Sequence, residues 1–169
     1  MAYLLDVNVL ITAHHLYYPV DAVPEFWDWL VHQGNAGAIK MPIETLEEVR
    51  DGSTDAERDL LFAWIQDAEH RRAILLEEDV QPELVQRVIA HYATDLTDDE
   101  LEAIGRDPFL IAHALADVAN RCVVTTEVSK RRLQRQNRHI PDVCADAGVQ
   151  CCDTFTMLRV LRFSTRWRG

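Results

Sequence analysis

Apolar residues along the chain fall into short runs and helically spaced stripes that follow one another in turn. The runs YLLDVNVLI at residues 3–11 and CVVTT at 122–126 are typical of buried strands. Segments between and after them repeat apolar residues at helical spacing. We expect helices over 24–34, 43–52, 56–70, 82–92, 107–120 and 155–163, and further short strands over 37–41, 73–76 and 149–152.

Strands that alternate with helices favour an α/β fold, a parallel sheet between two helical layers. The 169 residues suit a single domain spanning 1–169. In such sheets ligands bind at the carboxyl ends of the strands, close to the point where strand order reverses. The residues that directly follow each strand are therefore the first place to look for a site.

Particular residues indicate where these helices begin and end. Pro24 suits a first helical turn, and Gly34 and Gly52 suit helix ends. Asp107 is expected to cap the helix whose first residue is Pro108. The aromatic cluster FWDWL at 26–30 has helical spacing and is expected to pack in the core.

Composition and charge narrow the class of protein. No apolar run approaches 18 residues and no basic leader precedes the first strand, so we expect a cytoplasmic protein without a membrane span. The four cysteines show no zinc spacing and are expected to be reduced. The net charge is −11, yet residues 121–169 hold ten basic and four acidic side chains. This asymmetry suggests an acidic site beside a basic contact surface.

Carboxylates stand at positions that such a sheet brings to one edge. Asp6 ends the first strand, and Glu127 ends the strand at 122–126. Asp107 is expected to cap the helix before that strand, and the helix after the second strand carries Glu44, Glu47 and Glu48. Gathered carboxylates repel one another, and hard divalent cations relieve that repulsion. The pattern therefore points to Mg²⁺ or Mn²⁺ chemistry on phosphate esters.

Each carboxylate also has a simpler explanation. Asp6 or Asn8 caps a helix that begins near Val9, or Asp107 serves only as a cap. Glu47 and Glu48 belong to an acidic run that is typical of a solvated face, and Glu127 fits a loop. Their shared position at strand ends is what favours a site.

The chain resembles the PIN-domain family, in particular a PIN-like group similar to the ribonuclease toxins of bacterial toxin–antitoxin pairs. The resemblance runs in order through YLLDVNVLI, YYPVDAVPEFWDWL, IETLEEV, RDPFLIAHALA, VVTTE and IPDVCADAGVQC. It implies a three-layer sandwich whose parallel sheet has the order 3-2-1-4-5. It further implies hydrolysis of single-stranded RNA with Mg²⁺ or Mn²⁺, a homodimer, and an antitoxin protein as a partner.

The resemblance assigns roles to individual positions. Asp6, Glu48, Asp107 and Glu127 match the metal-binding and catalytic acids, with Glu47 as the alternative to Glu48. Glu127 departs from the aspartate usual there, which leaves open whether one metal or two are bound. Asn8 and Thr125 would orient a carboxylate or a phosphate around the site.

A basic run directly after Glu127 supplies what an acidic protein needs to approach RNA. Lys130, Arg131, Arg132 and Arg135 are expected to contact RNA phosphates, although a solvated face has the same composition.

Two other functions fit parts of the pattern. A PIN-like module that has lost its activity would bind RNA or protein only, and the Glu127 departure favours this. A phosphatase of the haloacid-dehalogenase type also places an aspartate after its first strand, but Asn8 stands where its second aspartate is required.

Overall fold

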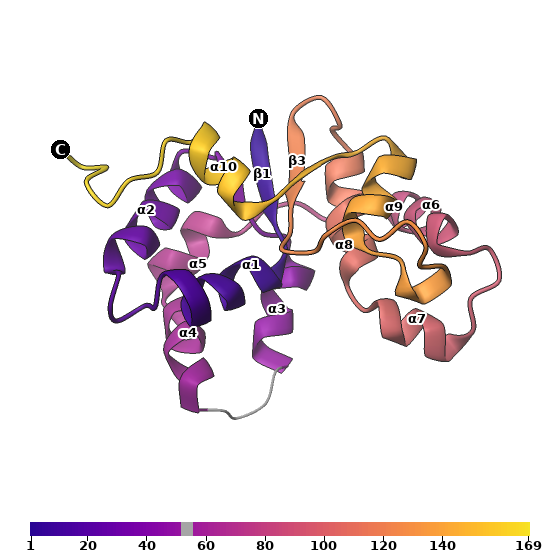
Figure 1. Cartoon of the computed structure of the whole chain (residues 1–169), viewed down its shortest axis with the longest axis horizontal. Helices are drawn as coiled ribbons and strands as arrows, with labels where there is room; N and C mark the ends of the chain where they lie inside the picture. Colours follow the sequence, from indigo (N-terminus) through magenta and orange to yellow (C-terminus); the bar gives the residue numbers. More distant parts are fainter. Residues whose placement is uncertain (52–55) are drawn as a thin grey trace.

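The computed structural model describes residues 1–51 and 56–169, with side chains described outside 49–59 (Figure 1). Four strands alternate with helices. The strands are β1 (Ala2–Leu5), β2 (Ile39–Lys40), β3 (Arg121–Val124) and β4 (Gln150–Cys152). The α-helices are α1 (Val7–Thr12), α2 (Pro24–Asn35), α3 (Ile43–Asp51), α4 (Ala56–Gln66), α5 (Ala68–Ile74), α6 (Pro82–Tyr92), α7 (Asp98–Ile104), α8 (Asp107–Leu115), α9 (Ile140–Ala147) and α10 (Thr154–Val160). A π-helix, η1 (Ala13–Tyr17), follows α1, and a 3-10 turn, η2 (Arg135–Asn137), precedes α9.

The sheet is parallel throughout, in the order β2-β1-β3-β4. Tyr3 pairs with Ile39 on one side and with Cys122 on the other, so β1 lies in the middle. The α/β class and the parallel sheet expected from the sequence are thereby confirmed.

The strand expected over 73–76 is not formed, and this corrects the five-strand prediction. Residues 68–74 form α5, and a single parallel bridge joins Leu75 to Met41. The Met41 N–H donates to the carbonyl of Ile74 at 2.7 Å and the Leu76 N–H donates to the carbonyl of Met41 at 2.8 Å. The bridge lies beside β2, where the third strand of the order 3-2-1-4-5 would pair.

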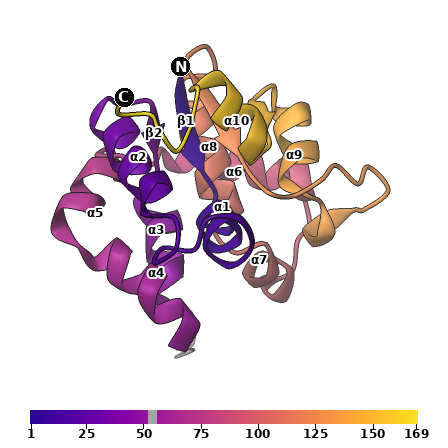
Figure 2. The ribbon, with the colours of Figure 1, turned by 60° about the vertical axis from the view of Figure 1, so that its left-hand side comes forward.

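Alternate residues of β1 face two separate cores, because successive strand side chains point to opposite faces. Leu5 joins a cluster with residues of α1, α2, α4 and α10, whereas Leu4 joins one with residues of α6, α8 and α9. The views agree that α2 and α5 lie on one side of β1 and α6, α8 and α9 on the other (Figures 1 and 2). The expected three layers are therefore present.

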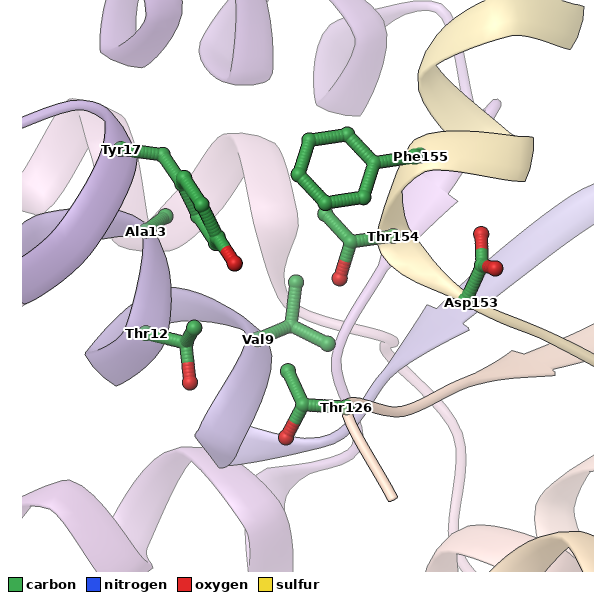
Figure 3. Close-up of a pocket in the computed structure, with 8 residues that line it drawn as sticks. All are labelled: Val9, Thr12, Ala13, Tyr17, Thr126, Asp153, Thr154 and Phe155. Carbon is green, nitrogen blue, oxygen red and sulfur yellow. The ribbon is translucent and has the colours of Figure 1, made fainter. Parts of the chain in front are cut away.

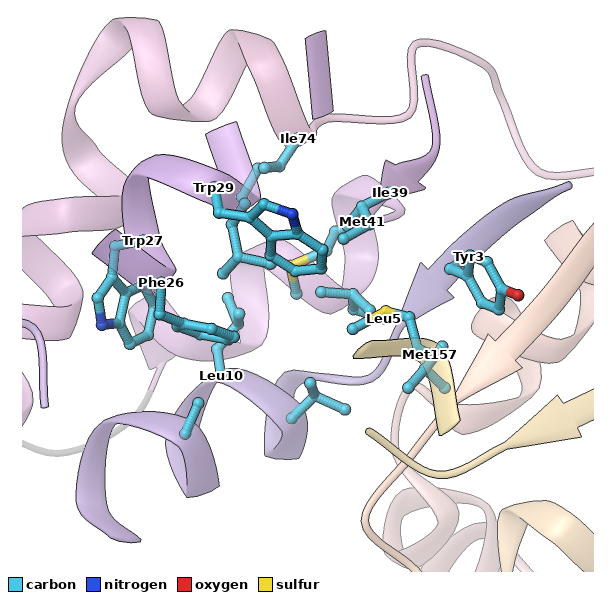
Figure 4. Close-up of a cluster of buried hydrophobic side chains, with 14 of the residues drawn as sticks. Tyr3, Leu5, Leu10, Phe26, Trp27, Trp29, Ile39, Met41, Ile74 and Met157 are labelled. Carbon is cyan, nitrogen blue, oxygen red and sulfur yellow. The ribbon is translucent and has the colours of Figure 1, made fainter. Parts of the chain in front are cut away.

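The aromatic segment of α2 packs inward as predicted. Phe26, Trp27 and Trp29 are each at most 2% exposed and form the outer part of the Leu5 cluster (Figure 4). These rings leave no stacking surface on α2.

Several boundaries differ from the sequence prediction. The α2 helix continues past Gly34 to Asn35, and Gly37 is the glycine with a positive φ of 74°. A Cβ on Gly34 would lie 2.7 Å from the carbonyl oxygen of Ala73, so this glycine permits close packing of α2 on α5. Gly52 lies outside the described residues. Asp107 is the first residue of α8 rather than its cap, which is Arg106.

Among the helices that the structure describes, none has the length and apolar character needed to cross a membrane.

Candidate functional site

Asp6 is the residue at which β1 ends and α1 begins. Its N–H donates to the carbonyl of Val124 at 2.9 Å, which extends the β1–β3 pairing by one step. Its carboxylate caps α1 by accepting from the backbone N–H of Asn8 at 3.4 Å. The capping role that the sequence left open is therefore real, and it orients Asp6 at the carboxyl edge of the sheet.

Thr125 fixes the other oxygen of Asp6. The Thr125 hydroxyl donates to Asp6 Oδ2 at 2.8 Å, a fully buried bond between the residues that follow β1 and β3. Burial raises the pKa of the Asp6 carboxyl above its ordinary value, the hydrogen bonds from Thr125 and Asn8 lower it, and the charge of Glu127 raises it. Asn8 and Thr125, which the sequence placed around the site, thus both hold Asp6.

Glu127 is tied to the same turn and to α9. Its N–H donates to the Thr125 hydroxyl at 3.2 Å, and its Oε2 accepts from the backbone N–H of Ile140 at 2.7 Å. Ile140 is the first residue of α9, so Glu127 satisfies an amide that the helix itself leaves unpaired. One oxygen of Glu127 is therefore used structurally.

Asp107 lies where the carboxylates converge. Burial, with smaller contributions from the charges of Asp6, Glu127 and Glu48, raises the pKa of Asp107 to about 8. Within the described part of the chain, no residue donates a hydrogen bond to this carboxylate. Its neighbours thus include all three of the acids that the sequence grouped with it.

Arg106 lies beside α3, the helix that carries Glu44, Glu47 and Glu48. Its guanidinium donates to the carbonyl of Glu44 at 2.7 Å and lies 3.5 Å from Glu47 Oε2. Glu47 is thus close to a cation, and the charge of Glu48 acts on Asp107. The structure favours Glu48 as the fourth acid. The sequence analysis missed Arg106, although a cation directly before Asp107 in GRDP was a usable signal.

The side chains of the four acids supply oxygen atoms, the type of ligand that hard divalent cations prefer. Asp6, Glu48, Asp107 and Glu127 are oxygen donors from four separate segments, and their mutual repulsion is what a cation such as Mg²⁺ relieves. Across residues 1–51 and 56–169, however, no three His, Cys, Asp or Glu side chains stand close enough to form a ready-made cage. The acids converge, and closure around an ion requires further side-chain movement.

The basic segment after Glu127 divides into two parts. Lys130, Arg131 and Arg132 are exposed on the loop that follows β3. Asp142 of α9 anchors this loop by accepting from the Ser129 hydroxyl and from the backbone N–H of Lys130. Asp142 is 5% exposed and was missed from the sequence, because its role depends on the turn of the chain rather than on any motif.

Arg135 does not offer its guanidinium to a phosphate, which corrects the prediction for this residue. Its Nε and Nη2 donate to the two oxygens of Glu100 at 2.6 and 2.7 Å, and its Nη1 donates to Asp95 at 2.7 Å. These bonds tie η2 to α7. Its φ of 56° is unusual for a side-chain-bearing residue, so the bonds hold a conformation that is otherwise disfavoured.

Comparison with known proteins gives a family but no activity. No curated protein and no solved structure matches the chain. A family model described as a domain of unknown function, DUF4411, matches residues 3–165. The chain therefore belongs to the DUF4411 family.

Proposed function

We propose that this chain is a PIN-like, metal-dependent endoribonuclease that hydrolyses single-stranded RNA. The observation that carries the proposal is the convergence of Asp6, Glu48 and Glu127 on the buried Asp107, where burial first and then their charges raise the pKa of Asp107. Asp6 and Glu127 follow β1 and β3, the neighbouring strands between which strand order reverses. That is the place where open parallel sheets bind their ligands.

The carboxylates would hold Mg²⁺ or Mn²⁺, which when bound lowers the pKa of water and polarises a phosphate. Thr125 and Asn8 fix the orientation of Asp6, and Glu127 is positioned by Ile140. Hydrolysis adds water across a phosphodiester: the phosphorus–3′-oxygen bond breaks and the 3′-oxygen takes a proton. Asp107 or Glu127 would help to orient the attacking water.

The biological setting follows from the resemblance. We propose a toxin of a toxin–antitoxin pair that acts in the cytoplasm as a homodimer, with an antitoxin protein as its partner. Growth arrest on expression of the wild type, relieved by Asp6→Asn, is the expected result in cells.

The Asp6→Asn variant tests the chemistry in the purified protein. Asparagine is as good a helix cap as aspartate and still accepts from Thr125, so the fold is retained. We expect the wild type to cleave a single-stranded RNA in Mn²⁺ and to melt at a higher temperature as Mn²⁺ is added, because binding to the folded state alone raises Tm. Both effects should disappear in Asp6→Asn.

Asp21→Asn is the matched control, since Asp21 is exposed and remote from the four acids in sequence. It should retain cleavage and the Tm shift. Wild-type protein that shows neither effect contradicts the proposal.

One observation favours a second function, a PIN-like module without activity that binds RNA or protein. Glu127 departs from the aspartate expected in the resemblance, and one of its oxygens is engaged by the Ile140 amide. In that case the wild type would bind single-stranded RNA or a protein partner with the same affinity in Mn²⁺ and in EDTA, and would leave the RNA intact.

A further inference from the structure

A pocket of about 220 Å³ lies between the end of α1 and the start of α10 (Figure 3). Val9 forms its wall one turn after Asp6, and Thr126 lines it between Thr125 and Glu127. The pocket is smaller than the roughly 300–1,000 Å³ of sites for drug-sized molecules, so its size suits a single ring system.

Two exposed aromatic rings form one side of the pocket. Tyr17 is 47% exposed and Phe155 is 41% exposed, with ring centroids 5.1 Å apart in an edge-to-face arrangement. They come from η1 and α10, segments far apart in the chain. Exposed rings from two elements at one pocket indicate a binding surface rather than chance exposure, because folding buries such rings where it can.

The remainder of the pocket is lined by three threonines, by Val9 and Ala13, and by Asp153, one oxygen of which accepts from the N–H of Thr156. Thr12 and Thr126 lie across it from the rings (Figure 3). Thr154 is 8% exposed, and its hydroxyl has no hydrogen-bond partner among the residues the structure describes. A buried hydroxyl left unpaired costs free energy, so a ligand that offers it a polar group is favoured over a purely apolar one.

Cationic side chains lie beyond the aromatic pair. Phe155 also lines a second pocket together with Arg159 and Arg162. Both arginines are exposed, and neither forms an ion pair within the described ranges. Aromatic faces next to cations are the combination by which proteins bind single-stranded nucleic acid.

We propose that the pocket between Tyr17 and Phe155 binds one base of the RNA strand, with Arg159 and Arg162 contacting a neighbouring phosphate. The proposal rests on the nuclease function above and adds the substrate contact that places the strand on the acids. The ring of the base would stack on the face of one of the two aromatic side chains, and the polar edge of the base would form hydrogen bonds with the threonine hydroxyls. An aliphatic side chain of a partner protein would fill the volume but leave those hydroxyls unpaired.

Binding in EDTA separates base recognition from cleavage. The probes are fluorescein-labelled oligoadenylate, oligocytidylate and oligouridylate of eight nucleotides, and an abasic oligomer of the same length. The wild type should bind at least one base-bearing probe about tenfold more tightly than the abasic one, the size expected for stacking of one base. Phe155→Leu and Tyr17→Leu should each lose most of that difference and bind the abasic probe unchanged.

Two controls define the readout. Phe62→Leu removes a ring that is 38% exposed on α4 and should leave the base preference intact. Arg159→Ala with Arg162→Ala should weaken binding of base-bearing and abasic probes by the same factor. A wild type without base preference, or a Phe155→Leu variant that keeps it, overturns the proposal.

The outcomes for pocket and nuclease are distinguishable. Metal-dependent cleavage of RNA without any base preference would refute the proposed base pocket and support the proposed nuclease function. If the wild type prefers base-bearing probes but never cleaves RNA, and Phe155→Leu loses that preference, the base pocket is supported and the nuclease function is refuted.

Discussion

Asp107 shows how four carboxylates alter the chemistry of one side chain. Burial and the charges of Asp6, Glu127 and Glu48 raise its pKa to about 8, whereas in the unfolded chain it titrates near its ordinary value of about 3.9. Between these values the folded state binds more protons than the unfolded state. The free energy of unfolding contributed by Asp107 therefore falls as the pH rises from about 4 to about 8.

The Asp107→Asn variant should remove this penalty in metal-free protein. The penalty grows by ~1.4 kcal/mol for each pH unit between the two pKa values, so we expect a clearly larger gain in the free energy of unfolding at pH 8 than at pH 5. Urea unfolding in EDTA at both pH values measures it, with Asp21→Asn as the control. Equal stability of variant and wild type at pH 8 would contradict the assigned environment.

At this scale the sequence predicted which acids meet but not how each is held. Asp6, Asp107 and Glu127 could be placed because a parallel sheet brings strand ends together. Glu47 and Glu48 could not be separated, because adjacent helical residues differ by only 100° in direction and Asp107, on which the charge of Glu48 acts, lies on another helix. Arg135 was predicted to contact RNA, because nothing in the sequence indicates that its guanidinium forms hydrogen bonds with Glu100.

Glu127 links the β3 turn to the start of α9. Its carboxylate accepts from Ile140, while the α9 residue Asp142 accepts from Ser129 and Lys130 in return. Residues 127–130, where the basic loop begins, are thereby attached to the start of α9. A helix whose first amides are satisfied in this way depends on that acceptor for part of its stability.

Replacing Glu127 should separate its structural role from its proposed metal role. Glu127→Ala removes the acceptor and should lower the free energy of unfolding in EDTA by about 1 kcal/mol, the usual cost of a lost cap. Glu127→Gln keeps an oxygen for Ile140 and should cost clearly less, yet it should weaken the Mn²⁺-dependent Tm shift as Glu127→Ala does. Chemical denaturation of both variants checks this, and equal losses in EDTA would refute the contact.

Elements were predicted well where apolar periodicity was strong and poorly where a tertiary contact decided. The α6 helix was expected over 82–92 and spans Pro82–Tyr92. The segment 73–76 was read as a strand because AILL suits one, yet helix α5 extends to Ile74 against Gly34. The α7 helix was missed although Thr97 and Glu100 form a capping box, a signal that the acidic surroundings concealed.

The molecule is acidic overall, but two groups of exposed basic side chains could contact the proposed RNA substrate. The net charge of −11 repels RNA at long range, so binding depends on local cations. Lys130, Arg131 and Arg132 are exposed beside Glu127, and Arg159 and Arg162 lie beyond Phe155. The two groups lie on segments that leave β3 and β4, which are neighbouring strands.

Removing the first group should weaken RNA binding without unfolding the protein. The triple variant Lys130→Ala, Arg131→Ala, Arg132→Ala should reduce the salt dependence of binding by ~0.7 per lost phosphate contact, or about 2 in slope if all three residues bind. Arg135→Ala should instead leave the slope unchanged and lower Tm, because its partners are Glu100 and Asp95. Anisotropy titrations at several salt concentrations distinguish these outcomes, and an unchanged slope in the triple variant would exclude this loop as a phosphate contact.

For the molecule as a whole, alternation of strands and helices was enough to predict the layers and the parallel sheet. It could not predict the pocket between η1 and α10, because Tyr17 and Phe155 carry no motif and meet only after β4 has joined the sheet. The position of the acids could be inferred from topology alone, whereas the aromatic surface beside them required coordinates.

The buried bond between Asp6 and Thr125 also constrains when the edge of the sheet that carries the acids can assemble during synthesis of the chain. The two residues are 119 positions apart, so the ribosome releases Asp6 long before its partner exists. A nascent chain has no assembled centre until β3 has been translated and has paired with β1.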